Sequence, residues 1–145
     1  MKIKVIITAI EEERIEIYAH EHSDLISKIE SLINDETKSV NGYFEDDIVS
    51  LKISEIYRFY VEDNKLYASG KDGIFQVKMR LYQIEELVGD SFVKINQSCL
   101  VNKSKIKKFS SSLGGYLLVE LKNGEKDYVS RRQTKVVLER MGIKK

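Results

Sequence analysis

Polar side chains that could bind nucleic acid gather in two short stretches of the last third of the chain. Asn96-Gln97-Ser98 interrupts an apolar run, and Ser130-Arg131-Arg132 opens a predicted helix. Asn and Gln can form paired hydrogen bonds with adenine, whereas Arg suits guanine or phosphate. The free amides at a helix N-terminus also favour phosphate. Because cations there oppose the helix dipole, these two arginines indicate a purpose other than helix stability.

Positive charge surrounds both stretches. The whole chain has a net charge of +1, but residues 94–145 hold 13 basic and 4 acidic side chains, whereas residues 1–47 hold 5 basic and 12 acidic ones. Five lysines crowd the basic region: Lys94, Lys103, Lys105, Lys107 and Lys108. This asymmetry favours a polyanionic partner. A second interpretation stays open, in which Asn96 and Asn102 form turns and the cations belong to a solvated surface.

Catalytic patterns are absent from the sequence. Cys99 stands among apolar residues, far along the chain from His20 and His22, so we expect a buried thiol rather than a nucleophile. The two histidines with Asp24 would make a weak metal site, and a surface pair is the better interpretation. There is no phosphate-binding loop, dinucleotide fingerprint or HExxH motif. We therefore expect no enzymatic activity, no metal, no cofactor and no small-molecule substrate.

Size and composition are those of a small globular protein. The chain has 145 residues, 42% of them hydrophobic, and its single cysteine excludes an internal disulfide framework. No run approaches the roughly 20 apolar residues that span a bilayer. The apolar run at residues 5–10 is cut off by Glu11-Glu12-Glu13, so we expect no signal peptide and a cytoplasmic location.

The first forty residues predict a small β-β-α unit. Residues 2–8 and 15–19 have the pattern of strands, and Ser23 could cap a helix whose apolar residues recur at helical spacing up to Ile33. Asn34 to Thr37 would end this helix. Because such a unit can hardly bury its faces alone, we expect it to dock on the remainder of the chain.

Short strands dominate from about residue 38 onward. Asn41-Gly42 and Glu45-Asp46-Asp47 have turn chemistry, and Asp72-Gly73 favours a hairpin. Strands are expected near residues 43–44, 48–51, 56–61, 66–69, 74–77, 92–101, 106–110, 116–121 and 125–129. Helical spacing appears at 81–88 and again from 130 to 141, where Ser130 and Gln133 have capping-box spacing. The fold class expected is mostly β with small helices (α+β).

Two motifs carry a resemblance to a known family. The run from Phe92 to Asn102, together with Leu121-Lys122-Asn123-Gly124 and the following Val129 to Arg132, resembles the LytTR family of bacterial DNA-binding domains. The resemblance covers about residues 45–142. It implies an elongated, mostly antiparallel LytTR-like β domain that reads double-stranded DNA with loops between its strands, at tandem direct repeats in promoters.

The resemblance also implies site residues. Gln97 matches a loop residue that reaches bases, where the family commonly has Asn, and Asn96 matches its neighbour, often His. Arg132 matches a basic residue at the start of the last helix, and Lys65 falls near a third contact loop that is shorter here. The full predicted DNA-binding set is Lys65, Lys94, Asn96, Gln97, Ser98, Asn102, Lys103, Ser130, Arg131 and Arg132.

The chain would then divide into an acidic N-terminal segment, 1–44, and a LytTR-like domain, 45–145. The segment is too short for a phosphoacceptor receiver domain, so the chain resembles stand-alone LytTR regulators, some encoded beside small membrane proteins that restrain them. Expected partners are double-stranded DNA, a second protomer (as a homodimer or paired on DNA), and a small membrane-protein inhibitor. The N-terminal segment could serve partner binding, self-association or a structural cap.

Two other functions remain as alternatives. One is a protein-interaction module that does not bind DNA. The other is a β domain that binds single strands or RNA by stacking bases on exposed aromatics such as Tyr57, Tyr60 and Tyr67. Most aromatic residues lie in 43–82, away from the basic third, which counts against stacking.

Overall fold

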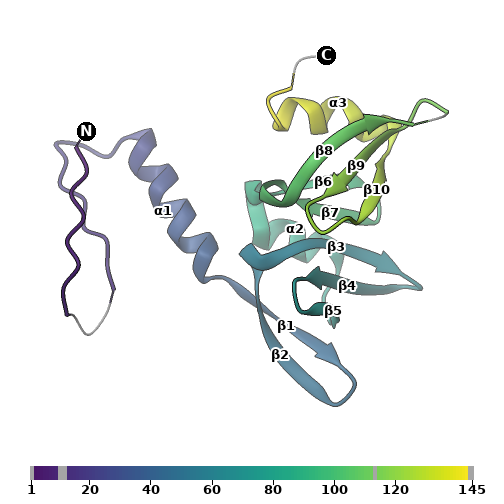
Figure 1. Cartoon of the computed structure of the whole chain (residues 1–145), viewed down its shortest axis with the longest axis horizontal. Coiled ribbons are helices and arrows are strands. Elements are labelled where there is room, and N and C mark those ends of the chain that lie inside the picture. Colours follow the sequence, from purple (N-terminus) through teal and green to yellow (C-terminus); the bar gives the residue numbers. More distant parts are fainter. Residues whose placement is uncertain (1, 10–12, 113, 144–145) are drawn as a thin grey trace.

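Seven antiparallel strands form the main sheet of the protein. In the computed structural model, which describes residues 2–9, 13–112 and 114–143, the strand order is β2-β1-β5-β4-β3-β7-β6 (Figure 1). The strands are β1 (Ser39–Phe44), β2 (Asp47–Lys52), β3 (Ile56–Glu62), β4 (Lys65–Gly70), β5 (Gly73–Val77), β6 (Phe92–Asn96) and β7 (Cys99–Asn102). Every pair of neighbouring strands in this sheet is antiparallel.

A second sheet and three α-helices complete the described chain. The small sheet has the order β10-β9-β8, from β8 (Ile106–Ser111), β9 (Leu117–Leu121) and β10 (Lys126–Val129). The helices are α1 (Asp24–Thr37), α2 (Leu81–Val88) and α3 (Arg131–Arg140), with single 3-10 turns η1 (Ile53–Glu55), η2 (Gly89–Ser91) and η3 (Lys103–Lys105). The expected class, mostly β with small helices and an elongated antiparallel domain, is confirmed.

Strands β6 and β7 lie between two apolar cores. On one face, Phe92 and Leu100 pack with Phe59 and with Ile84 of α2. On the other face, Val93 and its neighbours pack against the small sheet and α3. Nearly every residue of both strands is therefore buried, which explains the continuous apolar run in the sequence. The two strands therefore contribute side chains to both cores and separate one core from the other.

The two strands predicted in the N-terminal segment are wrong. Residues 2–9 and 13–19 form no strand, and Ile3 and Ile7 are 88% and 95% exposed. A two-stranded unit needs a third surface to be stable, and none of the described residues covers it. The predicted helix is confirmed as α1, where the amide of Ile26 donates to Ser23 Oγ over 3.4 Å.

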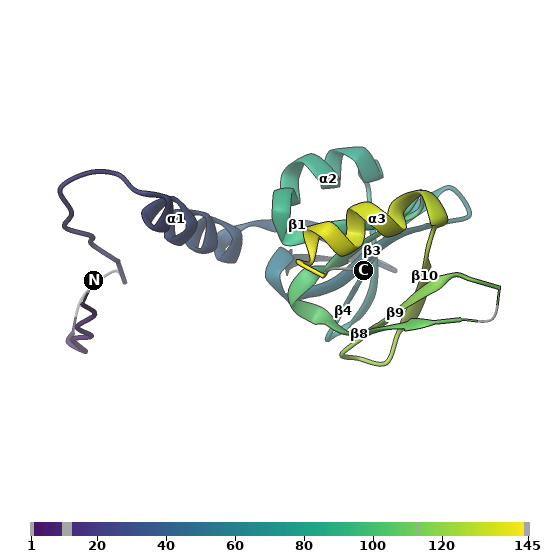
Figure 2. The same ribbon diagram turned by 90° about the horizontal axis from the view of Figure 1, so that it is seen from above.

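The position of the N-terminal segment also differs from the expected docking. Helix α1 contacts η1 near its C-terminal end, and both it and the preceding residues stand off from the β sheets (Figures 1 and 2). The large sheet begins at Ser39, inside the segment 1–44. None of the described helices combines the length and apolar character needed to cross a membrane.

Gly42 lies inside β1 rather than in the turn predicted from Asn41-Gly42. A Cβ atom at Gly42 would lie 2.6 Å from Leu51 Cδ1 and 2.8 Å from Phe75 Cβ. Real Cβ atoms do not approach that closely, so the pairing of β1 with β2 and β5 at this point requires glycine. Close packing, and not turn formation, explains the residue.

We predict that Gly42→Ala lowers the free energy of unfolding by about 1–3 kcal/mol, because the new methyl group overpacks the space beside Phe75. Gly70→Ala is the matched control, since a Cβ there would meet nothing nearer than 3.7 Å. Urea unfolding of the two variants measures the difference. Equal stability of both variants would contradict the packing explanation.

Candidate nucleic-acid interface

Several polar loops meet at one end of the large sheet. The amide of Val61, near the end of β3, donates to the Ser98 carbonyl over 2.9 Å, which brings the β3–β4 and β6–β7 turns together. The amide of Ser130 donates to the Ile95 carbonyl over 2.9 Å and fixes the start of α3 beside the same turns. We call this region the loop end; it lies on the right of Figure 1, whereas α1 joins the sheet on the left.

Gln97 and Ser98 are the exposed residues of the β6–β7 turn. Asn96, next to them, is only 3% exposed. Its Oδ1 accepts from the Ser98 amide over 2.9 Å, and its Nδ2 donates to the Tyr128 carbonyl over 2.9 Å. Asn96 therefore forms the turn and ties it to β10, as the turn-forming interpretation predicts, and Gln97 is the amide side chain presented to solvent.

Asn102 plays the same structural part at the opposite end of β7. It is 4% exposed, its Oδ1 accepts from the amide of Ser104 over 3.1 Å, and its Nδ2 donates to the Ile56 carbonyl over 2.8 Å. Lys103 follows it, and burial together with the charge of Arg140 lowers the pKa of Lys103. These residues are not brought together with Gln97. Both asparagines of the predicted DNA-binding set are thus buried and hydrogen-bonded within the protein.

Arg131 and Arg132 point to different surroundings. Arg131 Nη2 donates to the Gly114 carbonyl over 3.2 Å, and its guanidinium lies 5.3 Å from the centre of the Tyr116 ring. Arg131 therefore holds the β8–β9 turn against the start of α3. Arg132 is exposed at the loop end. Both arginines are exposed, and the guanidinium of Arg131 is engaged by the Gly114 carbonyl and the Tyr116 ring.

Ser130 forms only half of the predicted capping box. Its Oγ accepts from the amide of Gln133 over 3.3 Å, as a helix cap should. Its own amide is taken by the Ile95 carbonyl instead of by the Gln133 side chain. This backbone hydrogen bond from Ser130 to Ile95 ties the start of α3 to β6, and therefore to the turn that carries Gln97.

Lys65 belongs to the loop end, as the first residue of β4 directly after the tight turn that follows β3. Asp63 and Asn64 form that turn with φ values of 50° and 63°, a left-handed conformation that Asp and Asn tolerate. Lys94 lies in the middle of β6, opposite Leu100, and is half-buried. The structure thus places Lys65, Gln97, Ser98 and the start of α3 together, and leaves Lys94 beside the core.

Two cations of the loop end were missed in the sequence. Lys78 and Arg80 lie between β5 and α2, and the pairing of Leu66 with Val77 places them beside the β3–β4 turn. Together with Lys65 they line an open groove that contains no acidic residue. The hairpin signal at Asp72-Gly73 could have revealed them, because it places Lys78 across from Lys65. The positive charge of this groove is complementary to the negative charge of a phosphate backbone.

The lysines of the small sheet are partly neutralised. Lys107 and Lys126 each approach Glu120 to 3.6 Å, and Lys108 approaches it to 4.0 Å. Lys105 lies 5.3 Å from the centre of the Tyr57 ring. Much of the basic excess in the sequence therefore lies on the small sheet, apart from the loop end.

An ion-pair network holds the two sheets together. Arg58 of β3 donates from Nε to Glu125 Oε2 over 2.8 Å and from Nη1 to Asp127 Oδ2 over 3.0 Å. Ser69 of β4 also donates to Glu125, and Asn96 donates weakly to Asp127 over 3.5 Å. The network thus runs from β3 and β4, through β10 and its preceding turn, to the turn that presents Gln97.

Burial and hydrogen bonding set the pKa values of this network. Burial alone would raise the pKa of Glu125, but hydrogen bonds from Ser69, Asn123 and Arg58 outweigh it and hold that pKa below its usual value. Burial raises the pKa of the nearby Cys99 thiol to about 12. Cys99 is therefore a buried, protonated thiol at neutral pH, as its apolar neighbours predict.

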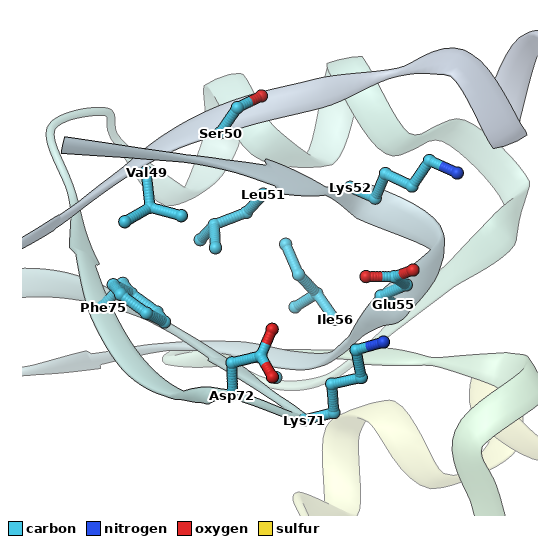
Figure 3. Close-up of a pocket in the computed structure, with 10 residues that line it drawn as sticks. Val49, Ser50, Leu51, Lys52, Glu55, Ile56, Lys71, Asp72 and Phe75 are labelled. Atoms are coloured by element: carbon cyan, nitrogen blue, oxygen red, sulfur yellow. The ribbon is translucent and has the colours of Figure 1, made fainter.

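A small hollow lies at the other end of the sheet, between β2 and the β4–β5 turn (Figure 3). Leu51, Ile56 and Phe75 supply apolar walls, and the rim carries two basic and two acidic side chains. In the described residues, no group of three or more His, Cys, Asp or Glu residues could hold a metal ion. The hollow has neither the charge excess nor the amide side chains of the loop end.

Comparison with known proteins identifies the family. Residues 46–142 match the LytTr DNA-binding domain. The chain belongs to the LytTR family.

Relatives and solved structures agree with this assignment. An uncharacterized HTH-type transcriptional regulator of Staphylococcus aureus strain bovine RF122 / ET3-1 is 33% identical, with 99% of each chain covered. A homologue of the same description from strain NCTC 8325 is 32% identical over the same shares. The LytTr DNA-binding domain of a methyl-accepting/DNA response regulator from Bacillus cereus superposes with a TM-score of 0.70, at 23% identity, covering 74% of this chain and 99% of that one.

The helix-turn-helix in the names of these relatives has no counterpart in the described part of this chain. Five strands separate α1 from α2, and another five separate α2 from α3. A helix-turn-helix needs two helices joined by a turn of a few residues. In this LytTR chain, loops between strands are the elements that project from the sheet.

We predict that Glu125→Gln lowers the free energy of unfolding at neutral pH and makes that free energy change less as the pH is lowered. The folded-state pKa of Glu125 is lowered, so its carboxylate stabilises the fold above the ordinary Glu pKa, and this contribution is lost as the pH falls through the lowered value. The variant should lose about 1–3 kcal/mol at pH 7. Urea unfolding should show this deficit shrinking near pH 3.

The control for this experiment is Glu86→Gln on the exposed surface of α2. It should change stability little at either pH. If Glu125→Gln shows the same deficit at both pH values, the ionised carboxylate is not what stabilises the network.

Proposed function

We propose that this LytTR chain is a transcriptional regulator that binds double-stranded DNA sequence-specifically through its loop end. The observation that carries the proposal is the convergence of separate loops at one end of the sheet, with Gln97 at the tip of the β6–β7 turn. An exposed amide can pair with the edge of adenine in the major groove, and Arg132 can contact guanine or phosphate. The DNA-binding domain of the family supports the same function.

The groove beside these residues suits the DNA backbone. Lys65, Lys78 and Arg80 come from two connections that flank the ends of β4 and β5, and the groove they line has no carboxylate. Phosphate contacts fix the position of a protein on a duplex, and base contacts then select the sequence. In this arrangement Gln97 and Arg132 read bases while the groove cations hold a neighbouring phosphate strand.

Positioning of the reading residues comes from buried polar groups. Asn96 fixes the shape of the Gln97 turn, and the bond from Ser130 to Ile95 sets its distance from Arg132. A site held by packed elements loses less entropy on binding than one on free loops. We assign Asn96 and Asn102 to positioning, and Gln97, Ser98, Arg132 and Lys65 to contact with DNA.

Base stacking on single strands is less well supported. Tyr60 lies 5.6 Å from Tyr67, ring centre to ring centre, and the Arg58 guanidinium covers it at 4.2 Å. Tyr57 is covered by Lys105. The three tyrosines considered for stacking are therefore already in contact with protein partners, and the duplex is the better-supported ligand.

The family resemblance extends the proposal to arrangement on DNA and to control. Tandem direct repeats would hold two protomers side by side, each reading one repeat with its loop end. A small membrane protein is proposed as an inhibitor, as for stand-alone regulators of this type. Binding of chromosomal DNA would place the protein in the cytoplasm.

We predict that Gln97→Ala and Arg132→Ala each weaken specific duplex binding by about 1–3 kcal/mol, roughly 5-fold to 150-fold, without lowering thermal stability. Lys71→Ala, an exposed cation at the other end of the sheet, is the control and should bind normally. A footprint on the DNA upstream of its own gene defines the site, and titrations with that duplex compare the variants. Unchanged affinity in both loop-end variants would contradict the assignment.

We also predict a steep salt dependence of duplex binding. If about five cations meet phosphates, log K against log salt should have a slope near −4 to −5. Lys78→Ala and Arg80→Ala should each make the slope shallower by about 1, whereas Lys71→Ala should leave it unchanged. A flat response for the wild-type protein would favour the protein-interaction alternative.

A further inference from the structure

The N-terminal part of the chain exposes an unusual amount of apolar surface. Two stretches, residues 2–9 and 13–19, and helix α1 contain large apolar side chains that the described chain leaves partly or almost wholly exposed. Ten of them are between 37% and 95% exposed: Ile3, Val5, Ile6, Ile7, Ile15, Ile17, Tyr18, Leu25, Leu32 and Ile33. A monomeric protein rarely leaves so many together, so this surface indicates an interaction site.

The spacing of these apolar residues is typical of strands and a helix that each bury one face against another element. Ile3, Val5 and Ile7 alternate with polar residues except at Ile6, and Ile15 and Ile17 alternate in the second stretch. Such alternation belongs to strands with one buried face. In α1, the exposed Leu25, Leu32 and Ile33 lie at helical spacing on one side. The single chain forms no strand at residues 2–9 or 13–19, although their alternation is compatible with strands that need a second surface to pair with.

The exposed area matches the requirement of a stable pairing. A fully exposed aliphatic side chain of this kind offers on the order of 100 Å². At their observed exposures, the ten side chains therefore present roughly 700 Å² of apolar area per chain. A stable interface buries about 800 Å² on each partner, a little over half of it apolar.

Net charge disfavours DNA or an acidic membrane as the partner of this segment, and the distribution of charge between its two stretches is compatible with pairing to a second copy. Residues 1–47 carry 12 acidic and 5 basic side chains, so phosphate groups are repelled. Within the segment the two stretches differ in net charge: Lys2 and Lys4 give the first stretch +2, whereas Glu13 and Glu16 with Arg14 give the second −1, and Arg14 pairs with Glu16 over 3.2 Å. Pairing the first stretch of one chain with the second stretch of another sets opposite charges across the strands.

The attachment of the segment leaves the loop end accessible. The ε-ammonium group of Lys38, which follows α1, donates to the Leu87 carbonyl over 3.2 Å, and α1 contacts η1. Both contacts lie at the end of the sheet opposite Gln97, and Figure 1 shows α1 leading away from the strands on that side. Pairing through this segment and DNA binding can therefore occur together.

We propose that residues 2–9, residues 13–19 and helix α1 bind the same parts of a second copy, so that the protein is a dimer in solution. Two copies supply four strand segments and two helices, enough to form a sheet with its apolar face covered by the paired α1 helices. This pairing does not require DNA. It would link the DNA-binding domains of two protomers before they reach a promoter.

The test compares two variants that add the same charges to the same elements. Ile7→Glu with Leu32→Glu places carboxylates on the apolar faces, whereas Thr8→Glu with Ser31→Glu places them on neighbouring exposed positions. All four side chains are exposed in the single chain, so both variants should fold, and circular dichroism checks this. Sedimentation equilibrium of the full chain without DNA is the measurement.

The wild-type protein and the Thr8/Ser31 control should sediment at twice the 16.8 kDa of one chain at micromolar concentration. The Ile7/Leu32 variant should dissociate, with a dimer dissociation constant raised about 100-fold or more. A monomeric wild-type protein, or equal dissociation constants for the two variants, would overturn the proposal.

Titration of the Ile7/Leu32 variant with a single-site duplex separates this proposal from DNA binding. It should bind one site with wild-type affinity, since the loop end is unchanged. A wild-type dimer that binds no duplex would support self-association and contradict the proposed function. A monomeric wild-type protein that binds the duplex would support the proposed function and contradict self-association.

Discussion

The guanidinium of Arg58, held between the carboxylates of Glu125 and Asp127, is the interaction on which the rest of the domain depends. It joins the large sheet to the small one at a point where only about a fifth of each side chain is exposed. Charges taken from water need all their partners, and removing one leaves the others buried and unpaired. The network therefore tolerates one relative placement of the two sheets. Asn96 shares Asp127 with Arg58, so this placement also fixes the turn that presents Gln97.

Burial of β6 and β7 on both faces complements this constraint. With a core on each side, neither strand can shift by one residue without moving apolar side chains into the wrong core. The β6–β7 turn is consequently rigid where it leaves the sheet, although Gln97 itself is exposed. The turns proposed to contact DNA are therefore supported by a packed scaffold, in which α2 closes one core and α3 the other.

Local patterns in the sequence were informative where neighbours in the chain decide the structure. Helix 81–88, the short strands and the cap at Ser130 were predictable from spacing, and the family resemblance implied the antiparallel β domain. Distant partners were not visible: Arg58 is 67 residues from Glu125, and no local pattern links them. The predicted strands at 2–8 and 15–19 failed because strand pattern alone does not supply a covering surface, and Gly42 was misread because its close neighbours come from other strands. Spacing also could not tell a buried Asn96 from an exposed Gln97, since both are polar and adjacent; burial and register separate them.

The central claim is that one end of the sheet forms the DNA-binding surface, and amide hydrogen exchange with and without a footprinted duplex tests it most directly. Exchange reports opening and shielding of individual backbone amides, so it resolves the two ends of the same strands. The account predicts that DNA slows exchange at residues 63–65, 78–80, 97–98 and 130–132, and leaves residues 70–72 and 103–105 unchanged. Protection concentrated at 70–72 and 103–105, with no change at 97–98, would contradict it.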